Sequence, residues 1–230
     1  MNRPSKNREL ESLKTNYKSI ADVTCEKLRK AILEGVFSPG EQLKERELAT
    51  LMGVSTTPIK AALQRLGMEG LVTSLPMRGS FVAENISAIL TEVGLIRAAL
   101  EGTAAYLAAM KATDEEITTL QGQIEKMERC TADRDIGRAI EANTNFHEII
   151  HQISGNHSLQ QMTGIVRQYD DITRPQALSD ESQMVQGLQE HKAIFEAIKA
   201  GDPEGADASM RAHVLRNTRF LKQQGLGVGK

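Results

Sequence analysis

Three histidines have the clearest capacity for chemistry, because each is predicted on the inward side of a different helix. His191 and His213 fall among apolar residues at helical spacing. His147 lies on the shoulder of an apolar helix face, and Asn143 precedes it by one turn. Neutral imidazoles are the commonest protein ligands for zinc and similar ions, and residues four apart on a helix direct two donors to one place. The pattern therefore favours a metal site.

A single inward histidine is more often a core residue whose ring nitrogens are satisfied by hydrogen bonds. Three unpaired imidazoles would carry a desolvation penalty, so the set favours a ligand role. We predict a divalent ion held by Asn143, His147, His191 and His213, with zinc as first choice and nickel or another divalent ion as alternatives. His151 is expected to point toward solvent.

A site of three histidines with an open position is also catalytic geometry, so a metal-dependent hydrolase or oxygenase is the rival interpretation. The predicted inward faces carry no evident general base. We therefore expect a protein that is not an enzyme.

Arg97 lies on the apolar side of a predicted helix, and a buried arginine needs a partner because an uncompensated charge is costly. Two interpretations remain open. The partner is either Glu101, one turn away, or the carboxylate of a small effector, which Arg97 and the metal would grip together. Arg167 and Arg174 are expected on a polar, solvated side of their helix, and they are secondary candidates for effector contact.

Six helices are predicted to position these residues. Apolar spacing and turn signals place them at residues 86–111, 114–132, 135–154, 157–178, 181–200 and 203–224. Because the connections between them are short, the helices are expected to form an antiparallel bundle. No convincing strand is predicted after residue 85.

The preceding residues have a different organisation. Residues 45–71 read as two short helices joined by a turn at Gly53, with Ser55 as the N-cap of the second helix. An earlier helix and a later hairpin complete a winged helix-turn-helix, in which the second helix of the pair enters the DNA major groove. The alternative is a compact helical domain whose serines, threonines and lysine are merely solvated. The whole chain is thus predicted as mainly α, with a small β-hairpin near its start.

Charge supports a division near residue 84. Residues 1–84 carry 13 Lys and Arg against 10 Asp and Glu, whereas residues 85–230 carry 15 against 20 and all five histidines. We predict a flexible tail over 1–16, a DNA-binding domain over 17–84, and a helical effector, metal-binding and dimerisation domain over 85–230.

Composition excludes several classes of protein. No apolar run approaches the ~20 residues of a membrane span, and the first residues lack the apolar core of a secretory signal. Cys25 and Cys130 are far apart, which argues against a disulfide framework. A cytoplasmic protein without a membrane partner is expected.

The front region resembles the GntR family of bacterial transcription regulators. The resemblance rests on ERELATLMGVSTTPIKAALQRLGMEGLV at residues 45–72 and RGSFV at 78–82. It implies contacts to double-stranded operator DNA from the first helix of the pair, the recognition helix and the wing. The implied residues are Arg46, Ser55, Thr56, Thr57, Lys60, Arg78 and Gly79.

Three positions depart from the usual pattern of that family. Thr56 and Lys60 stand where arginines are usual, and Ala61 stands where a glutamate is usual. Threonine cannot make the bidentate contact of arginine to guanine, and lysine offers a point charge in place of a fork. The operator is therefore expected to differ from that of typical members.

Residues 90–222 resemble the FCD ligand-sensing domain of the FadR branch of that family. The resemblance rests on IRAALEGTAAYLAA, NTNFHEIIHQISGN, QEHKAIFEAIKAGD and MRAHVLRN. Metal-binding members have an aspartate where this chain has Asn143, so the resemblance implies a weaker site or one completed by a carboxylate ligand. It also implies a homodimer and a repressor of a metabolic operon that a small carboxylate releases from DNA. A purely structural metal, with an acyl thioester or another effector, is the alternative.

Overall fold

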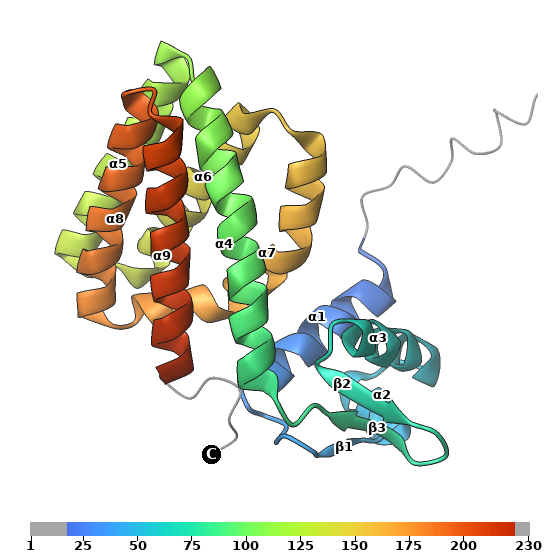
Figure 1. The fold of residues 1–230 in the computed structure, drawn as a ribbon. Coiled ribbons are helices and arrows are strands. Elements are labelled where there is room, and N and C mark those ends of the chain that lie inside the picture. Colours follow the sequence, from blue (N-terminus) through green and yellow to red (C-terminus); the bar gives the residue numbers. More distant parts are fainter. Residues whose placement is uncertain (1–17, 224–230) are drawn as a thin grey trace, which may run out of the picture.

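The computed structural model describes residues 18–223, so the tail predicted for residues 1–16 lies outside the described range. Within this range the chain is mainly helical, with a small sheet near its start (Figure 1). Its elements are α1 (Ile20–Leu33), β1 (Gln42–Leu43), α2 (Glu45–Met52), α3 (Thr56–Met68), β2 (Val72–Leu75), β3 (Gly79–Val82), α4 (Ile86–Lys111), α5 (Asp114–Asp133), α6 (Ile136–Ser154), α7 (His157–Leu178), α8 (Glu181–Lys199) and α9 (Pro203–Gln223). The predicted fold class, a winged helix-turn-helix followed by a helical bundle, is confirmed.

The front region packs α1 and α2 against α3. Gly53 ends α2 in the left-handed conformation with φ 65°, and Ser55 is the N-cap of α3, so the turn forms where the sequence predicts it. The inward face of α3 is fully buried and consists of Ile59, Ala62, Leu63 and Leu66. Beside it, the strands form an antiparallel sheet in the order β1-β3-β2. The β2–β3 hairpin is the wing.

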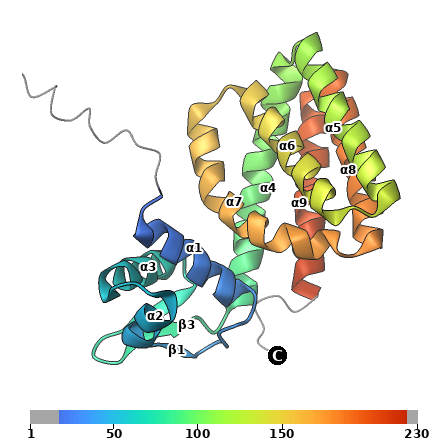
Figure 2. The same ribbon diagram turned by 180° about the vertical axis from the view of Figure 1, so that it is seen from behind.

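The rear region is a bundle of α4 to α9, in which α4 lies along α9 (Figures 1 and 2). Small residues allow this close approach. A Cβ atom at Gly94 would clash with Thr218, and one at Gly102 would clash with Asp207. The core around them is formed by alanines of α4 and larger apolar residues of the other helices. The bundle interior therefore has well-fixed walls.

Helix α4 is long and apolar enough to cross a membrane by length and composition. In this fold its small residues pack against α9, and it also carries the buried charges of Arg97 and Glu101. A helix at the centre of a protein core passes the same test of composition, so we interpret α4 as a core helix.

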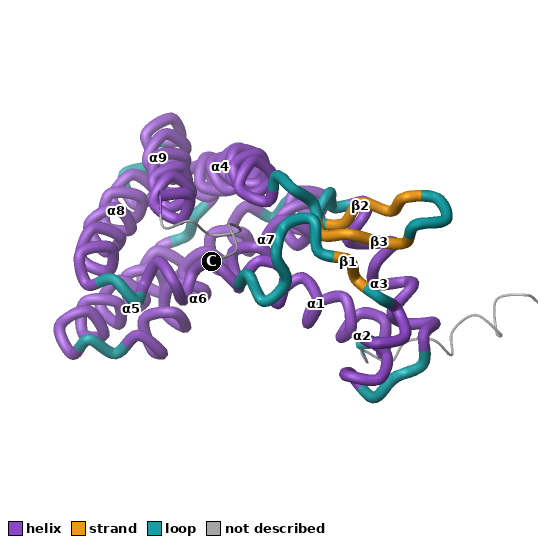
Figure 3. Tube along the Cα trace, turned by 90° about the horizontal axis from the view of Figure 1, so that it is seen from below, coloured by secondary structure: helices purple, strands orange, loops and turns teal. Residues whose placement is uncertain are grey.

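The two regions meet at the start of α4 and along α7. Ile86 of α4 and Tyr169 of α7 are buried in the core of the front region, and Ile172 packs against it. In the view from below, α7 is the bundle helix beside α1 (Figure 3). Helix α7 is therefore part of both the bundle and the surface that supports the front region.

Candidate functional site

The three predicted histidines meet inside the bundle. His147 comes from α6, His191 from α8 and His213 from α9, and all three side chains are buried. Ligand atoms of the three rings all lie within 4.8 Å of one another. The Nε2 atoms of His147 and His191 are 3.4 Å apart, and the ring centroids of His191 and His213 are 4.4 Å apart. The helical spacing in the sequence therefore placed these residues correctly.

The outer nitrogen of each ring has an acceptor. The distances are 3.1 Å from His147 Nδ1 to the Glu101 carboxylate, 2.6 Å from His191 Nδ1 to the Gly187 carbonyl, and 2.8 Å from His213 Nδ1 to the Glu190 carboxylate. A neutral imidazole has one N–H, so each ring donates from Nδ1 and carries its lone pair on Nε2. Such outer contacts are the usual means by which proteins orient histidine ligands.

Burial keeps the rings neutral. It lowers the pKa of His147 to about 4, although Glu101 opposes the shift, and it holds the pKa of His191 well below the usual range. Burial also lowers the pKa of His213. The three Nε2 lone pairs are thus available as ligands, and amide nitrogens of Asn143 and Asn217 lie 3.3 Å from Nε2 of His191 and of His213. The donor set fits a divalent ion of the zinc type, and the cluster could hold a metal.

Asn143 lies at the same place. Its side chain is buried, and its Nδ2 atom is 3.3 Å from His191 Nε2. Rotation of the amide by half a turn would present the oxygen instead, so Asn143 can serve either as a hydrogen-bond donor to the ring or as a neutral oxygen ligand. Its ligand role remains a prediction.

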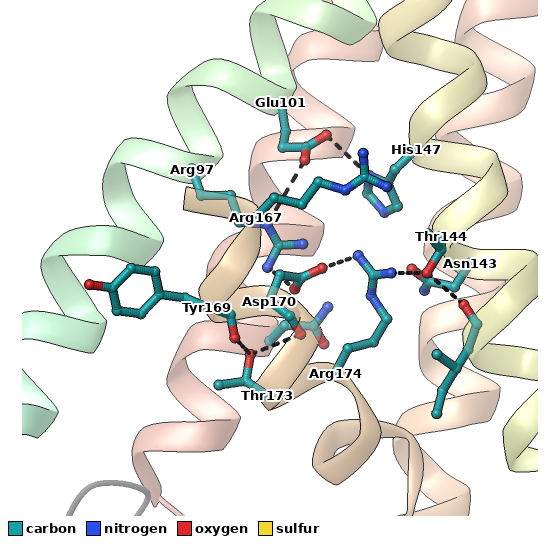
Figure 4. Close-up of polar contacts among 12 residues, drawn as sticks. Arg97, Glu101, Asn143, Thr144, His147, Arg167, Tyr169, Asp170, Thr173 and Arg174 are labelled. Atoms are coloured by element: carbon teal, nitrogen blue, oxygen red, sulfur yellow. Dashed lines mark hydrogen bonds and ion pairs between the residues drawn. The ribbon is translucent and has the colours of Figure 1, made fainter. Parts of the chain in front are cut away.

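Arg97 has a direct partner that sequence reasoning missed. It forms an ion pair with Asp170 of α7, while its Nε atom is 4.0 Å from Glu101 Oε1 (Figure 4). Asp170 also pairs with Arg174, whose guanidinium donates to Thr144. Two buried arginines therefore share one buried carboxylate. Glu101, the partner that the sequence suggested, is a more distant contact of Arg97 than Asp170 is. The interpretation that Arg97 binds an effector remains a proposal.

The expectation that Arg174 is solvated is wrong, because its pairing with Asp170 compensates its charge inside the bundle. Arg167 is half-buried and pairs with Glu148. The expectation for His151 is also wrong. It is buried, and its Nε2 atom lies 3.1 Å from the same Glu101 oxygen that His147 contacts.

Glu101 is thus shared by two imidazoles one helical turn apart. Burial alone would raise the pKa of Glu101, but His147 and His151 together hold it well below the usual range. The carboxylate stays ionised and remains an acceptor. Glu101 therefore fixes the ring of His147 in the orientation that presents Nε2 to the cluster.

A pocket adjoins the histidine cluster. Its atom-free space is about 610 Å³, including its open mouth. The polar part of its lining consists of Arg97, Asn143, Asp170, Arg174, His191 and His213, among others. Guanidinium groups and a metal ion both favour carboxylate ligands, so the chemistry of this wall suits a small organic anion.

The residues implied in DNA contact lie on the front region. Arg46, Ser55, Thr57, Lys60, Arg78 and Gly79 are exposed, and Thr56 is half-buried. Lys60 is on the side of α3 opposite its buried face, where its Nζ atom is 3.7 Å from Glu45. Ser55 caps α3 by position, but its side chain makes no capping hydrogen bond. These placements are compatible with DNA contact, and the individual roles remain predictions.

Both regions of the chain match known protein families. The model of the bacterial regulatory proteins of the gntR family matches residues 20–82, and the FCD domain model matches residues 92–216. The chain belongs to the GntR family. Its relatives are DNA-binding transcription regulators, and the expectation that this protein is not an enzyme is confirmed.

Two relatives and one structure illustrate the match. The HTH-type transcriptional regulator YdhC of Bacillus subtilis is 31% identical over 199 residues, covering 85% of this chain and 88% of YdhC. The galactonate operon transcriptional repressor of Escherichia coli is 26% identical over 217 residues, covering 85% and 94%. The structure of E. coli McbR/YncC shares the fold, with a TM-score of 0.64 and 24% identity over 90% of this chain and 99% of that one.

For this GntR-family chain, the functional residues missed in the sequence are mainly charged residues of α7. Asp170 and Arg174 are four apart, which was a usable signal for an ion pair. Glu190 precedes His191 directly, yet it contacts His213 of the next helix, and only the packing of α8 against α9 reveals this.

Proposed function

We propose that this GntR-family protein is a repressor of a metabolic operon that is released from its operator by a small carboxylate bound beside a zinc ion in the bundle. The convergence of three buried imidazoles next to Arg97 and Arg174 supports this proposal most strongly. The regulator class follows from the family, and the related galactonate repressor illustrates control of a metabolic operon.

In this proposal His147, His191 and His213 hold the ion, and Asn143 is a fourth, weaker ligand. Bound zinc would supply positive charge that attracts and orients a carboxylate. Because Asn143 is neutral, none of the four proposed ligands offsets the charge of the ion. An anionic effector gripped by Arg97 would compensate it.

DNA recognition is proposed to follow the family pattern. Arg46 and the wing would contact the DNA backbone, and the exposed side of α3 would enter the major groove. Because Thr56 and Lys60 replace the usual arginines, the operator would be atypical. The protein would act in the cytoplasm, where the operator lies.

A homodimer would provide two such domains for two half-sites. Leu95, Ile96 and Met110 are exposed apolar residues of α4, with 55%, 54% and 61% of their surfaces accessible. An exposed apolar side of a core helix supports self-association through α4. Effector binding would then change the spacing of the two winged domains and weaken operator binding.

A thermal-shift screen of mono-, di- and tricarboxylates, with and without chelator, tests the effector. Operator affinity is then measured on a duplex selected from a random library. We expect a carboxylate that stabilises the metal-loaded protein and weakens its DNA binding. If chelation lowers thermal stability but leaves the response to carboxylates unchanged, the metal is structural. If no carboxylate changes DNA affinity, the proposed effector class is wrong.

The Arg97→Ala variant should lose the response to the carboxylate while keeping operator affinity, because Arg97 lies in the bundle and the proposed DNA-binding residues lie on the front region. Arg134→Ala removes an exposed arginine that pairs with Glu181, and it serves as the matched control. Fluorescence anisotropy titrations with and without the carboxylate measure both quantities. An unchanged response in Arg97→Ala would return Arg97 to a structural role.

A further inference from the structure

A hydrogen bond joins the bundle to the end of the recognition helix. The Tyr169 hydroxyl of α7 donates to Glu69 Oε2 at 3.1 Å, and Glu69 is the C-cap residue of α3. Tyr169 is 6% exposed and packs into the core of the front region. Burial raises the pKa of Tyr169 above its usual range, so the hydroxyl stays protonated and remains a donor.

Glu69 does not depend on this bond for its charge balance. Its two oxygens accept from Arg29 Nε at 2.7 Å and from Arg29 Nη2 at 2.6 Å, in a bidentate pair within the front region. Tyr169 is therefore an additional, neutral partner. Its hydroxyl can be removed without leaving an unpaired buried charge.

The next residue of α7 faces the effector pocket. Asp170 is 6% exposed and pairs with Arg97 and Arg174, whereas Tyr169 points away from that group (Figure 4). A second pocket is lined by Tyr169, Asp170 and Arg97 together, so the ion pair lies between the two cavities. One turn of α7 thus contacts both the pocket wall and the end of α3.

An anion in the pocket would compete with Asp170. Arg97 and Arg174 share one carboxylate, and a second carboxylate would weaken the hold of each on Asp170. A buried aspartate cannot stay in place without compensation, so this turn of α7 would shift. Pro175 follows directly and lacks a backbone donor, which gives α7 a point at which to bend.

We infer that Tyr169 and Glu69 are positioning residues that link the Arg97–Asp170 pair in the bundle to the recognition helix α3. This inference rests on the proposed function only for the identity of the signal, a carboxylate in the pocket. The physical link itself is a property of the chain without ligand or DNA.

Hydrogen exchange of the full chain tests the link through a double-mutant cycle. Arg97→Gln frees Asp170 from α4 while leaving it paired with Arg174, and Tyr169→Phe removes the hydroxyl but keeps the ring. Peptides covering the last turn of α3 are compared among wild type, both single variants and the double variant. Peptides from α2 are the internal reference, and Tyr106→Phe on α4 is the matched control for loss of a phenol hydroxyl.

Arg97→Gln should speed exchange at the end of α3 by about two- to tenfold, the range set by the loss of one hydrogen bond. In the Tyr169→Phe background the same substitution should change exchange there by less than about twofold, because the bond is already absent. Tyr106→Phe should leave α3 unchanged. Equal effects in both backgrounds, or no effect of Arg97→Gln on α3, would overturn the inference.

A second variant on the pocket side tests whether the result is specific to the Arg97→Gln substitution. Asp170→Asn should also speed exchange at the end of α3, and again less in the Tyr169→Phe background. If the Asp170→Asn variant does not fold, the cycle with Arg97→Gln alone tests the inference. Failure of this cycle leaves the proposed repressor function intact. Failure of every carboxylate to change DNA affinity contradicts that function and leaves the cycle intact.

Discussion

Three buried arginines show that the two regions pair buried charge in different ways. In the front region Arg29 is 2% exposed and meets a single carboxylate, Glu69, with two short hydrogen bonds. In the bundle Arg97 and Arg174 share the one carboxylate of Asp170, beside three imidazoles whose Nε2 atoms face one another. The front pair is closed on itself, whereas the bundle joins Arg97, Arg174 and the carboxylates of Asp170 and Glu101 in one shared network beside imidazoles that could bind a cation.

This difference has a functional meaning. Balanced buried groups hold the front region in one arrangement, so that its exposed residues can meet a fixed target. In the bundle the imidazole lone pairs are available to a metal ion, and arginines that share a carboxylate can accept another one. The bundle interior therefore offers groups for a metal and for an anion side by side, which is why we place sensing in the bundle and DNA reading in the front region.

Asp170→Asn should have the largest effect on stability. It removes the anion that two buried arginines share, and breaking such a pair costs about 3–5 kcal/mol. Chemical denaturation measures the loss. The matched control is Asp207→Asn, which breaks the ion pair between Asp207 and Arg211 on α9. These two residues have the same spacing but are partly exposed, so the loss of stability should be less than about 1 kcal/mol. Equal losses would contradict the contrast between buried and exposed pairs.

Acid should destabilise the metal-free protein by a smaller amount. The folded pKa of His147 is about 4, below the value of about 6.5 in an unfolded chain, so the unfolded state binds the proton first. Stability is then fully present above pH ~6.5 and falls as the pH drops toward ~4. Protonation of His147 alone should lower the free energy of unfolding by about 1 kcal/mol between pH ~7 and ~5.5.

Thermal unfolding of chelated protein across this range measures the effect. His147→Gln should make the pH dependence of stability less steep, and the rest of it should remain because burial also lowers the pKa of His191 and of His213. A dependence as steep as that of the wild type would show that His147 is not the group that titrates.

Substitutions on the DNA face should have the smallest effect on stability. Lys60→Ala and Arg78→Ala should change the free energy of unfolding by less than about 0.5 kcal/mol, because both side chains are exposed. Each should nevertheless weaken operator binding and lower the slope of log affinity against log salt by about 1 per bound subunit. Exposed Lys222→Ala on α9 is the control. Unchanged affinity and slope in both variants would contradict the proposed DNA face.

The fold was predictable because apolar spacing and turn residues agree along the chain. The helix limits from residue 86 onward follow from caps such as Thr113 and breaks such as Gly201. Gly53 likewise marked the turn before α3. Local signals along the sequence and the packing of the folded chain point to the same elements, so the sequence alone predicts the helix limits well.

The candidate site was predictable only in part. The histidines lie among apolar residues, so helical spacing shows that they point inward. Helix α7 instead buries Tyr169, Asp170, Thr173 and Arg174, and polar residues give no apolar period. Their burial depends on charges from α4 and α7 meeting in three dimensions, and a pattern along one helix cannot reveal such pairing.

The metal content of protein purified without a histidine tag tests the central claim most directly. Elemental analysis should find about one divalent ion, zinc first, per wild-type chain and per His157→Ala chain, which alters an exposed histidine. His191→Ala should retain less than about one-tenth of that amount. A wild-type protein that takes up no divalent ion after incubation with zinc, or an unchanged content in His191→Ala, would contradict the account.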